Sequence, residues 1–399
     1  MTGYLIRRVF QMAIVVLISA VVSYALLNLA PGGPMAGLGQ ATQNSRFRIT
    51  EDDIARIRAY FELDLSLPVR FSRWLIGEPR GPITIGGHEY FANLIVGCRI
   101  PIQTQVLNKN GKYDTKTTGC KQYVTLKDLV GRRTSNGILL GDFGRSWTIL
   151  RDRPVSELLA SRIPNTLKLL GTELIISLII GIPLGIYSAV KQYSKFDYFF
   201  TSLAFMGSAM PTFFFGILMI LFFSVLPKLA GLPYLPPGSS EAVRDYVIPL
   251  IGTIKAGSLA DQLLHMILPV LVLVFVSVSS YSRYIRASML DVLRQDYVRT
   301  ARAKGLTERV VILKHALRNA LIPFITIIVF SLPGLFGGAL ITETVFSWPG
   351  MGRLYVQALG NYDYPVNMAI LFITAVLTVI ATLIRDILYT VVDPRIRFS

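Results

Sequence analysis

The chain lacks the residue patterns that most often support catalysis or metal binding. No Gly-x-x-x-x-Gly-Lys-Ser/Thr loop occurs anywhere, so the chain has no phosphate cradle of its own. Its three histidines lie far apart in sequence, and neither a His-Glu-x-x-His nor a Cys-x-x-Cys spacing appears. The sequence therefore predicts no catalytic residue, no metal site and no cofactor bound by this chain.

One basic stretch, residues 297–323, is the strongest candidate for a contact surface. It favours a helix up to Gly305 and lies between two segments hydrophobic enough to cross a bilayer. A charged helix between two spans must stand on one side of the membrane, where Gly305 can end it at a left-handed or a close-approach position. A second short helix, 308–317, is expected to lead back to the membrane. The alternative is a solvated basic loop that only sets the topology.

The composition indicates an integral membrane protein. Of the 399 residues, 52% are hydrophobic and 16% are charged, and the mean hydropathy is +0.52. Ordinary soluble domains carry about 25% charged residues. The net charge of +16 does not favour nucleic acid as a partner, because cytoplasmic loops of membrane proteins collect Lys and Arg.

Six apolar segments are predicted to span the membrane. The first covers residues 9–30, and we favour a retained span because the apolar region of a cleaved signal peptide, the alternative, is usually about 7–15 residues long. The third contains Pro211, where a kink or a tilt is expected. The remaining spans are expected at residues 167–190, 198–227, 262–282, 319–342 and 364–389.

The distribution of charge predicts the orientation of the chain. Basic residues outnumber acidic ones between 291 and 318, whereas the last outer loop is almost free of positive charge. We therefore expect both termini in the cytoplasm. Residues 1–30 would form a transmembrane helix, 31–162 an extracytoplasmic domain, and 163–399 a five-helix core with cytoplasmic helices around 291–318.

The expected outer region contains the two cysteines of the chain, Cys98 and Cys120. They bracket a predicted hairpin centred on Asn110-Gly111, and a second hairpin is predicted around Gly86-Gly87. A two-residue turn would place Cys98 opposite Tyr123, so a bridge to Cys120 needs a bulge or irregular strand ends. We predict this disulfide because the pair is isolated and outside the cell; two free buried thiols are the alternative.

Several residues in or beside the spans are candidates for a translocation pathway. Glu173 and Glu343 are charged, and intramembrane charge is functional by default, although the outer interface tolerates it. Residues around Pro211 could line a pore or simply pack against helices. The candidates are Glu173, Met206, Ser208, Met210, Thr212 and Glu343.

Residues 299–305 resemble the Glu-Ala-Ala…Gly coupling motif of permease subunits in ABC importers, in the form of the dipeptide/oligopeptide family. Several other segments match that family in the same order. The resemblance covers residues 1–35 and about 140–399, and is closest to the first permease of the pair, which has a long segment after its first span. The further matching segments are residues 162–166, 181–185, 315–323, 343–350 and 393–395.

The resemblance implies an all-α polytopic fold with the six helices of a type I ABC importer permease and an extracytoplasmic α+β insertion. It also implies a prokaryotic inner-membrane location and import of di- or oligopeptides. The implied partners are a second permease in a pseudo-twofold pore, two cytoplasmic ATPase subunits that bind ATP and Mg, and an extracytoplasmic binding lipoprotein or periplasmic protein. The implied coupling residues are Tyr297, Arg299, Thr300, Ala301, Arg302, Ala303, Lys304 and Gly305.

Two departures from the family pattern are visible. Arg299-Thr300 replaces the acidic Glu-Ala, so an acid-mediated contact to the ATPase is not carried over. Residues 76–140 form an insertion whose role the sequence does not assign. Permeases of this architecture also serve nickel chelates, glutathione and oligosaccharides. An ATP-independent secondary transporter is the alternative from another class, but it would need a coupling-ion site and usually inverted repeats.

Overall fold

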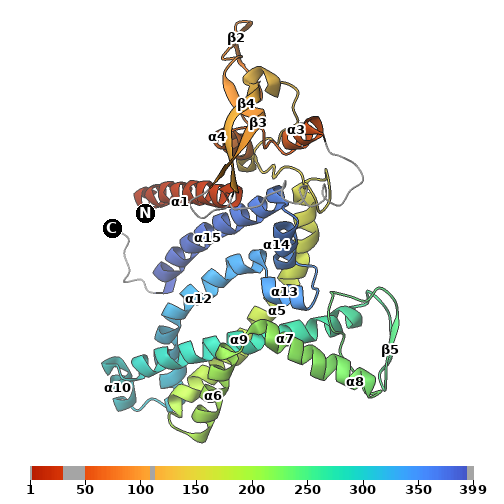
Figure 1. The fold of residues 1–399 in the computed structure, drawn as a ribbon. Helices are drawn as coiled ribbons and strands as arrows, with labels where there is room; N and C mark the ends of the chain where they lie inside the picture. The colour runs from red at the N-terminus through yellow and green to blue at the C-terminus, as the bar shows by residue number, and fades with distance from the viewer. Residues whose placement is uncertain (1, 30–49, 108–112, 393–399) are drawn as a thin grey trace. The chain divides into compact units, whose positions relative to one another are not determined.

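The computed structural model describes residues 2–29, 50–107 and 113–392 (Figure 1). The turn predicted at 110–111 and the motif at 393–395 lie outside these residues. Contacts divide the chain into two compact units. Unit 1 comprises Met1–Val16, Ala160–Val356 and Ile373–Ser399, and unit 2 comprises Leu17–Leu159 and Gln357–Phe372.

The six predicted spans are confirmed. Within the described ranges, six helical segments are long and apolar enough to cross a membrane. Several exceed the predicted bounds, because a helix can continue past the apolar run that crosses the bilayer. The segments are Ile6–Leu29, Val155–Val190, Thr212–Leu229, Leu259–Leu293, Glu308–Val345 and Tyr364–Tyr389.

Unit 1 is helical, with a small β-hairpin, β5 (Tyr246–Ile248) and β6 (Gly252–Ile254). Its long helix α9 packs against α6, α7 and α12 (Figure 1). The helices of this unit, two of which continue into unit 2, are α5 (Val155–Val190), α6 (Lys195–Ala209), α7 (Thr212–Ile220), α8 (Leu226–Leu229), α9 (Leu259–Leu293), α10 (Asp296–Ala303), α11 (Glu308–Val310), α12 (Leu317–Gly337), α13 (Leu340–Val345) and α14 (Met351–Gly360). The terminal helices α1 (Thr2–Leu29) and α15 (Tyr364–Val392) also run through both units.

The third predicted span is divided at Pro211 instead of merely kinked. Helix α6 ends at Ala209, Met210 is extended with ψ 125°, and α7 begins at Thr212. Proline disfavours the helical conformation of the residue before it and donates no backbone hydrogen bond, which explains the break. A π-helical turn, Leu221–Val225, then joins α7 to α8.

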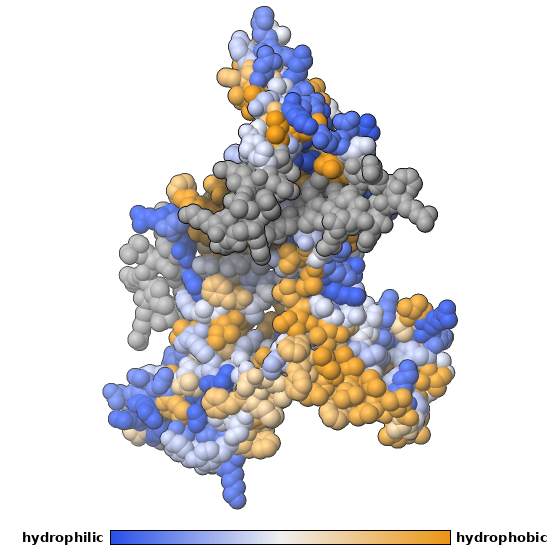
Figure 2. All heavy atoms as spheres, viewed as in Figure 1, coloured by the Kyte–Doolittle hydropathy of each residue, from blue (hydrophilic) through white to orange (hydrophobic). Residues whose placement is uncertain are grey.

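Helix α5 approaches α9 so closely that two positions of its Gly-Ile-Pro-Leu-Gly segment have no room for a side chain. A Cβ atom on Gly185 would lie 2.7 Å from the Cβ of Ile285, and one on Gly181 would lie 3.1 Å from the Cβ of Tyr281. The larger core cluster of unit 1 continues along α9 and α12, where Met289 and Phe324 are fully buried. Hydrophobic side chains also gather on the outer face of α7 and α8 (Figure 2), as expected for lipid-facing helices.

Unit 2 combines short helices with two β-hairpins. Helices α3 (Glu51–Tyr60) and α4 (Leu67–Ile76) precede the strands. Strands β1 (Ile83–Ile85) and β2 (His88–Tyr90) form the first predicted hairpin, in which Phe91 leaves the strand with φ +62°. Strands β3 (Ile95–Leu107) and β4 (Tyr113–Thr125) form the second, longer hairpin.

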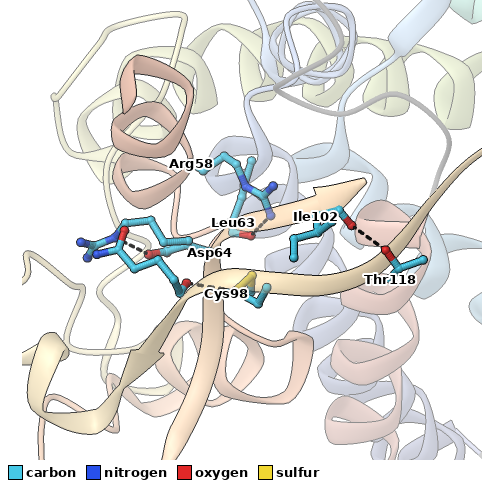
Figure 3. Close-up of a disulfide and its surroundings, with 9 residues drawn as sticks. Arg58, Leu63, Asp64, Cys98, Ile102 and Thr118 are labelled. Carbon is cyan, nitrogen blue, oxygen red and sulfur yellow. Dashed lines mark hydrogen bonds and ion pairs between the residues drawn. A yellow bond between two sulfur atoms is a disulfide. The ribbon is translucent and has the colours of Figure 1, made fainter. Parts of the chain in front are cut away.

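The disulfide between Cys98 and Cys120 is confirmed, with the Cα atoms 5.9 Å apart (Figure 3). Cys98 pairs with Tyr123, as a regular register requires, and Cys120 pairs with Pro101. Register shifts on either side of Ile100 bring the two sulfur atoms together. The irregular strand predicted from the spacing is therefore what permits the bridge.

A buried carboxylate organises the base of this hairpin. Asp64 is 1% exposed. It forms ion pairs with Arg132 at 2.9 Å and Arg99 at 3.9 Å, and its backbone carbonyl accepts a hydrogen bond from the Cys98 amide (Figure 3). Leu65 and Val96 begin the apolar core beside it. The hairpin is thus attached to the segment between α3 and α4.

Candidate functional site

The basic stretch forms a helix–turn–helix elbow in which α10 is short and amphipathic. Val298 and Ala301 are 0% and 5% exposed, and they pack with Val311. These two residues are three apart in sequence and share one helical face. The other side chains of α10 therefore point away from the core of unit 1.

Gly305 ends α10 in the left-handed conformation, the first of the two alternatives that the sequence left open. Its φ is +74°, and its amide donates to the Arg302 carbonyl at 2.9 Å. A Cβ atom at this position would meet nothing within 4 Å. The glycine is therefore required by the backbone conformation and not by close packing inside this chain.

Seven of the eight predicted coupling residues are exposed, and Ala301 is the exception. The Tyr297 side chain is 42% exposed and that of Arg299 is 72% exposed. We name the exposed set the elbow surface, and Figure 2 shows hydrophilic side chains at this end of the molecule. The elbow surface consists of Tyr297, Arg299, Thr300, Arg302, Ala303, Lys304 and Gly305.

An ion pair joins the two arms of the elbow. Arg302 Nη2 lies 2.7 Å from Glu308 Oε1, and Nε lies 3.1 Å from Oε2. Because Arg302 donates these hydrogen bonds to Glu308, the pKa of Arg302 lies above its ordinary value. Both groups are partly exposed, so the pair fixes geometry more than it adds stability.

The elbow is attached to two long helices through buried contacts. After α11, a π-helical turn, Val311–Ala316, leads into α12. Ala316 and Ala320 are fully buried against Ile285 and Met289 of α9. The Ser288 hydroxyl also donates to the Ala320 carbonyl at 2.8 Å. A force applied to the elbow would consequently reach α9 and α12 together.

A second anchor, which the sequence analysis missed, joins α6 to α9. Asp197 accepts two hydrogen bonds from the Arg286 guanidinium, at 2.7 and 2.8 Å, and one from the Tyr193 amide at 3.0 Å. Its side chain is 3% exposed. Hydrogen bonding from Arg286 holds the pKa of Asp197 below its ordinary value. The Ser194-x-x-Asp197 cap could have marked the acid, but nothing in the sequence pairs it with Arg286.

The structure places Glu343 at the centre of a closed hydrogen-bond network. The residue is 0% exposed. It accepts hydrogen bonds from the amides of Ala339 (3.2 Å) and Arg353 (2.9 Å) and from the Thr166 hydroxyl (3.1 Å). A Cβ atom on Gly350 would lie 2.5 Å from both Glu343 Oε2 and Thr166 Oγ1. This carboxylate therefore has several donors and little space beside it.

The segments around 162–166 and 343–350 contact each other directly. The indole of Trp348 donates to the Asn165 backbone carbonyl at 3.0 Å, and the Asn165 side-chain Nδ2 donates to the Pro349 carbonyl at 3.2 Å. The Met351 amide donates to the Thr166 hydroxyl at 2.7 Å. Two motifs far apart in sequence thus form one structural joint in unit 1.

The remaining candidate pathway residues lie on other parts of unit 1. Glu173 is 8% exposed and accepts from the Ser177 hydroxyl at 2.9 Å on the same helix. Met206 is 50% exposed, and Ser208 donates to the Ala204 carbonyl on its own helix. Among the described residues, no hydrogen bond or ion pair joins Glu173 to Glu343 or to the segment around Pro211. The described part of the chain also contains no group of three or more metal-ligating side chains.

The chain belongs to a family of transport permeases. Residues 181–398 match the family described as binding-protein-dependent transport system inner membrane component. This match covers the elbow, the Asp197–Arg286 anchor and the 343–350 side of the joint, whereas Asn165 and Thr166 lie before it. The match begins within the second span and covers the four spans that follow it.

The chain is also similar to permeases whose names identify them as peptide transport proteins. The chain is 45% identical over 258 residues to the oligopeptide transport system permease protein AppB of Bacillus subtilis, covering 65% of this chain and 77% of the relative. It is 40% identical over 270 residues to the dipeptide transport system permease protein DppB of Escherichia coli, covering 65% and 78%. A putative peptide permease protein of Brucella suis is 32% identical over 399 residues and covers all of both chains.

Proposed function

We propose that this chain is a permease subunit of an ATP-binding-cassette importer and forms half of a translocation pore for di- and oligopeptides. The elbow surface carries this proposal, because an exposed cationic turn is fixed by buried contacts to α9 and α12. The family match and the names of the relatives support the peptide class. A substrate-binding protein would deliver the peptide.

The proposed assembly contains partners that supply the energy. A second, related permease completes a pseudo-twofold pore, and two cytoplasmic ATPase subunits bind ATP and Mg. The extracytoplasmic partner is a binding lipoprotein or a periplasmic protein. The elbow surface and both termini face the cytoplasm, in a prokaryotic inner membrane, which agrees with the basic residues of the elbow.

The proposed mechanism transmits a movement and requires no chemistry in this chain. ATP binding and hydrolysis would change the contacts that the ATPase makes with the elbow surface, which differ between the inward-open and outward-open states. Because the buried cluster of Val298, Ala301 and Val311 packs against Val292 and Leu293, α10 would move as one body with the end of α9. The Asp197–Arg286 ion pair would then carry that movement to α6.

The candidate pathway residues and Glu343 have different proposed roles. Glu173, Met206, Ser208, Met210 and Thr212 are kept as pathway candidates. For Glu343, full burial and three hydrogen-bond donors favour a positioning role that holds α13 against α5. Residues 31–162 are proposed as the extracytoplasmic domain and residues 163–399 as the permease core.

Reconstitution tests the proposed function. The chain, its second permease and the ATPase subunits would be placed in proteoliposomes with the binding protein, and uptake of a labelled dipeptide would be measured. We expect uptake that requires ATP and stops when the ATPase subunits are omitted. Peptide uptake by this chain alone, driven by an ion gradient, would contradict the proposal.

A further inference from the structure

Unit 2 contains a cavity of about 600 Å³ that the transport proposal does not use. Two of its lining residues, Tyr24 and Asn28, belong to the end of the first span. Another, Tyr364, begins the last span, and Arg70 and Trp74 come from α4. The cavity therefore lies where two membrane-spanning segments reach a membrane surface. All of these residues belong to unit 2.

Two groups of aromatic side chains line the cavity. In the first group, the rings of Tyr24 and Trp74 are 5.3 Å apart. In the second group, Trp147 stacks on Tyr364 at 5.7 Å and contacts Phe61 at 4.7 Å. Tyrosine and tryptophan are enriched where a membrane meets water, because one part of each side chain is apolar and the other is polar.

Two buried donors from α4 have no acceptor. Arg70 Nε and Trp74 Nε1 are both inaccessible to solvent, and neither has a hydrogen-bond partner within the described residues. The two residues are four apart on one helix, so they project from the same face. Buried donors normally have an acceptor, which makes this pair an expected site for an oxygen-bearing group.

Arg70 is also a cation whose charge is not balanced by an ion pair. Three other cations that line the cavity are neutralised: Arg73 pairs with Glu62 at 2.6 Å, Arg132 with Asp64 at 2.9 Å and Arg133 with Asp152 at 3.2 Å. Arg145, a further lining cation, donates to the Asp152 backbone carbonyl at 2.6 Å. In the part of the chain that the structure describes, Arg70 forms no such pair. Its charge and the adjacent indole N–H together favour an oxyanion.

We propose that this cavity binds the phosphate of an anionic phospholipid headgroup, with Arg70 and Trp74 as the donors. Its position at the ends of two spans favours a lipid over a soluble anion, because a bilayer lipid can place its phosphate there while its acyl chains stay in the membrane. The aromatic rings would contact the glycerol region. This inference concerns unit 2 and does not rest on the proposed transport function.

The test compares lipid binding by three variants of the full chain in its purified complex. Arg70→Gln removes the charge, and Trp74→Phe removes only the indole N–H. Arg56→Gln is the matched control, because Arg56 is an exposed cation of α3 outside the cavity. Native mass spectrometry would titrate phosphatidylglycerol against a diacylglycerol with the same acyl chains. A second titration would use trialanine with a free carboxylate.

We expect saturable binding of phosphatidylglycerol to the wild type, and no binding of the diacylglycerol at the same site. Arg70→Gln and Trp74→Phe should each weaken phosphatidylglycerol binding by about tenfold or more, because each removes a hydrogen bond to a charged group. Arg56→Gln should bind as the wild type does.

Three results would overturn the proposal. The first is unchanged phosphatidylglycerol binding in both cavity variants. The second is equal binding of the diacylglycerol. The third is binding of trialanine to the wild type that Arg70→Gln abolishes and that displaces no lipid. This result would assign the site to a soluble carboxylate. If Arg70→Gln does not fold, Trp74→Phe alone decides, because it keeps the ring that packs on Tyr24.

Discussion

Arg302 and Glu308 form a bidentate ion pair across the left-handed turn at Gly305, with Nη2–Oε1 and Nε–Oε2 distances of 2.7 and 3.1 Å. The pair closes a short elbow whose outer residues are exposed and whose inner residues are buried. The shape of the elbow therefore depends on one backbone conformation that glycine favours and on two side chains that hold its arms together.

Gly305→Arg should abolish ATP-dependent uptake while the protein still inserts into the membrane. A Cβ atom at Gly305 meets nothing within 4 Å in this chain, so the cost to the fold is only the left-handed strain, about 1–2 kcal/mol. The new side chain would instead occupy the surface proposed for the ATPase. Peptide uptake would be measured together with the amount of the variant protein in the membrane fraction.

Gly231→Arg is the matched control for this variant. Gly231 also has a positive φ, +68°, and also has no atom within 4 Å of a Cβ position, but it lies far from the elbow in sequence. We expect it to retain uptake. Equal uptake by Gly305→Arg and Gly231→Arg would contradict the coupling role proposed for Gly305.

Asp197→Asn should destabilise the protein by about 3–5 kcal/mol, because it leaves Arg286 without its buried counter-ion. Thermal unfolding of the purified complex would measure the loss. Asp296→Asn is the control: its side chain is 97% exposed, and its contact with Arg299 is 3.6 Å long. Equal melting temperatures for the two variants would show that the α6–α9 anchor adds no stability.

The pH dependence of the same anchor has a defined sign. Hydrogen bonds from Arg286 lower the pKa of Asp197 in the folded state below its unfolded value of about 3.9. The stabilisation is therefore complete above that value and is lost as the pH falls through the lower, folded pKa. The difference in melting temperature between wild type and Asp197→Asn should stay constant from pH 7 to about 5 and shrink below about pH 4. A difference that grows on acidification would contradict this assignment.

Gly350→Ala should destabilise the joint between α5 and α13 by about 1–3 kcal/mol, because its methyl group would overlap Glu343 and Thr166. Gly171→Ala, in α5, adds the same atom where nothing lies within 4 Å, and it should be neutral or stabilising. Melting temperatures of the two variants would be compared. A fall in uptake without a fall in stability would instead place Gly350 and Glu343 in the pathway.

Cys98→Ser should lower the stability of unit 2 by about 3 kcal/mol, the loss expected for a cross-link between residues 22 apart in sequence. Limited proteolysis of the long hairpin would detect the change, with Cys98→Ser/Cys120→Ser as the comparison. In the wild type, non-reducing mass mapping should recover the bridged peptides. Recovery of both cysteines in alkylated form would contradict the disulfide.

Local sequence patterns predicted the features that depend on local geometry. The left-handed turn at Gly305 was predicted because glycine is favoured where φ is positive. The register that places Cys98 opposite Tyr123, and hence the need for an irregular strand, followed from a two-residue turn. The spans were predicted because the bilayer demands long apolar helices.

Contacts between distant segments could not be predicted in the same way. Thr166 and Glu343 are 177 residues apart, and Asp197 and Arg286 are 89 apart. Hydrophobic periodicity identifies elements but not which polar side chains meet when the helices pack. The sequence alone therefore indicates that Glu343 is an intramembrane charge, but not that it accepts from Thr166, and it does not indicate that Asp197 pairs with Arg286.

Cross-linking from residue 304 tests the central claim most directly. Lys304→Cys would introduce a free thiol on the elbow surface, because Cys98 and Cys120 are bonded to each other. A short thiol–amine cross-linker would be added to the assembled transporter with and without ATP. We predict a cross-link to the ATP-hydrolysing subunit whose yield changes with ATP. Modification of residue 304 only from the outer side of the membrane, with no such cross-link, would contradict the account.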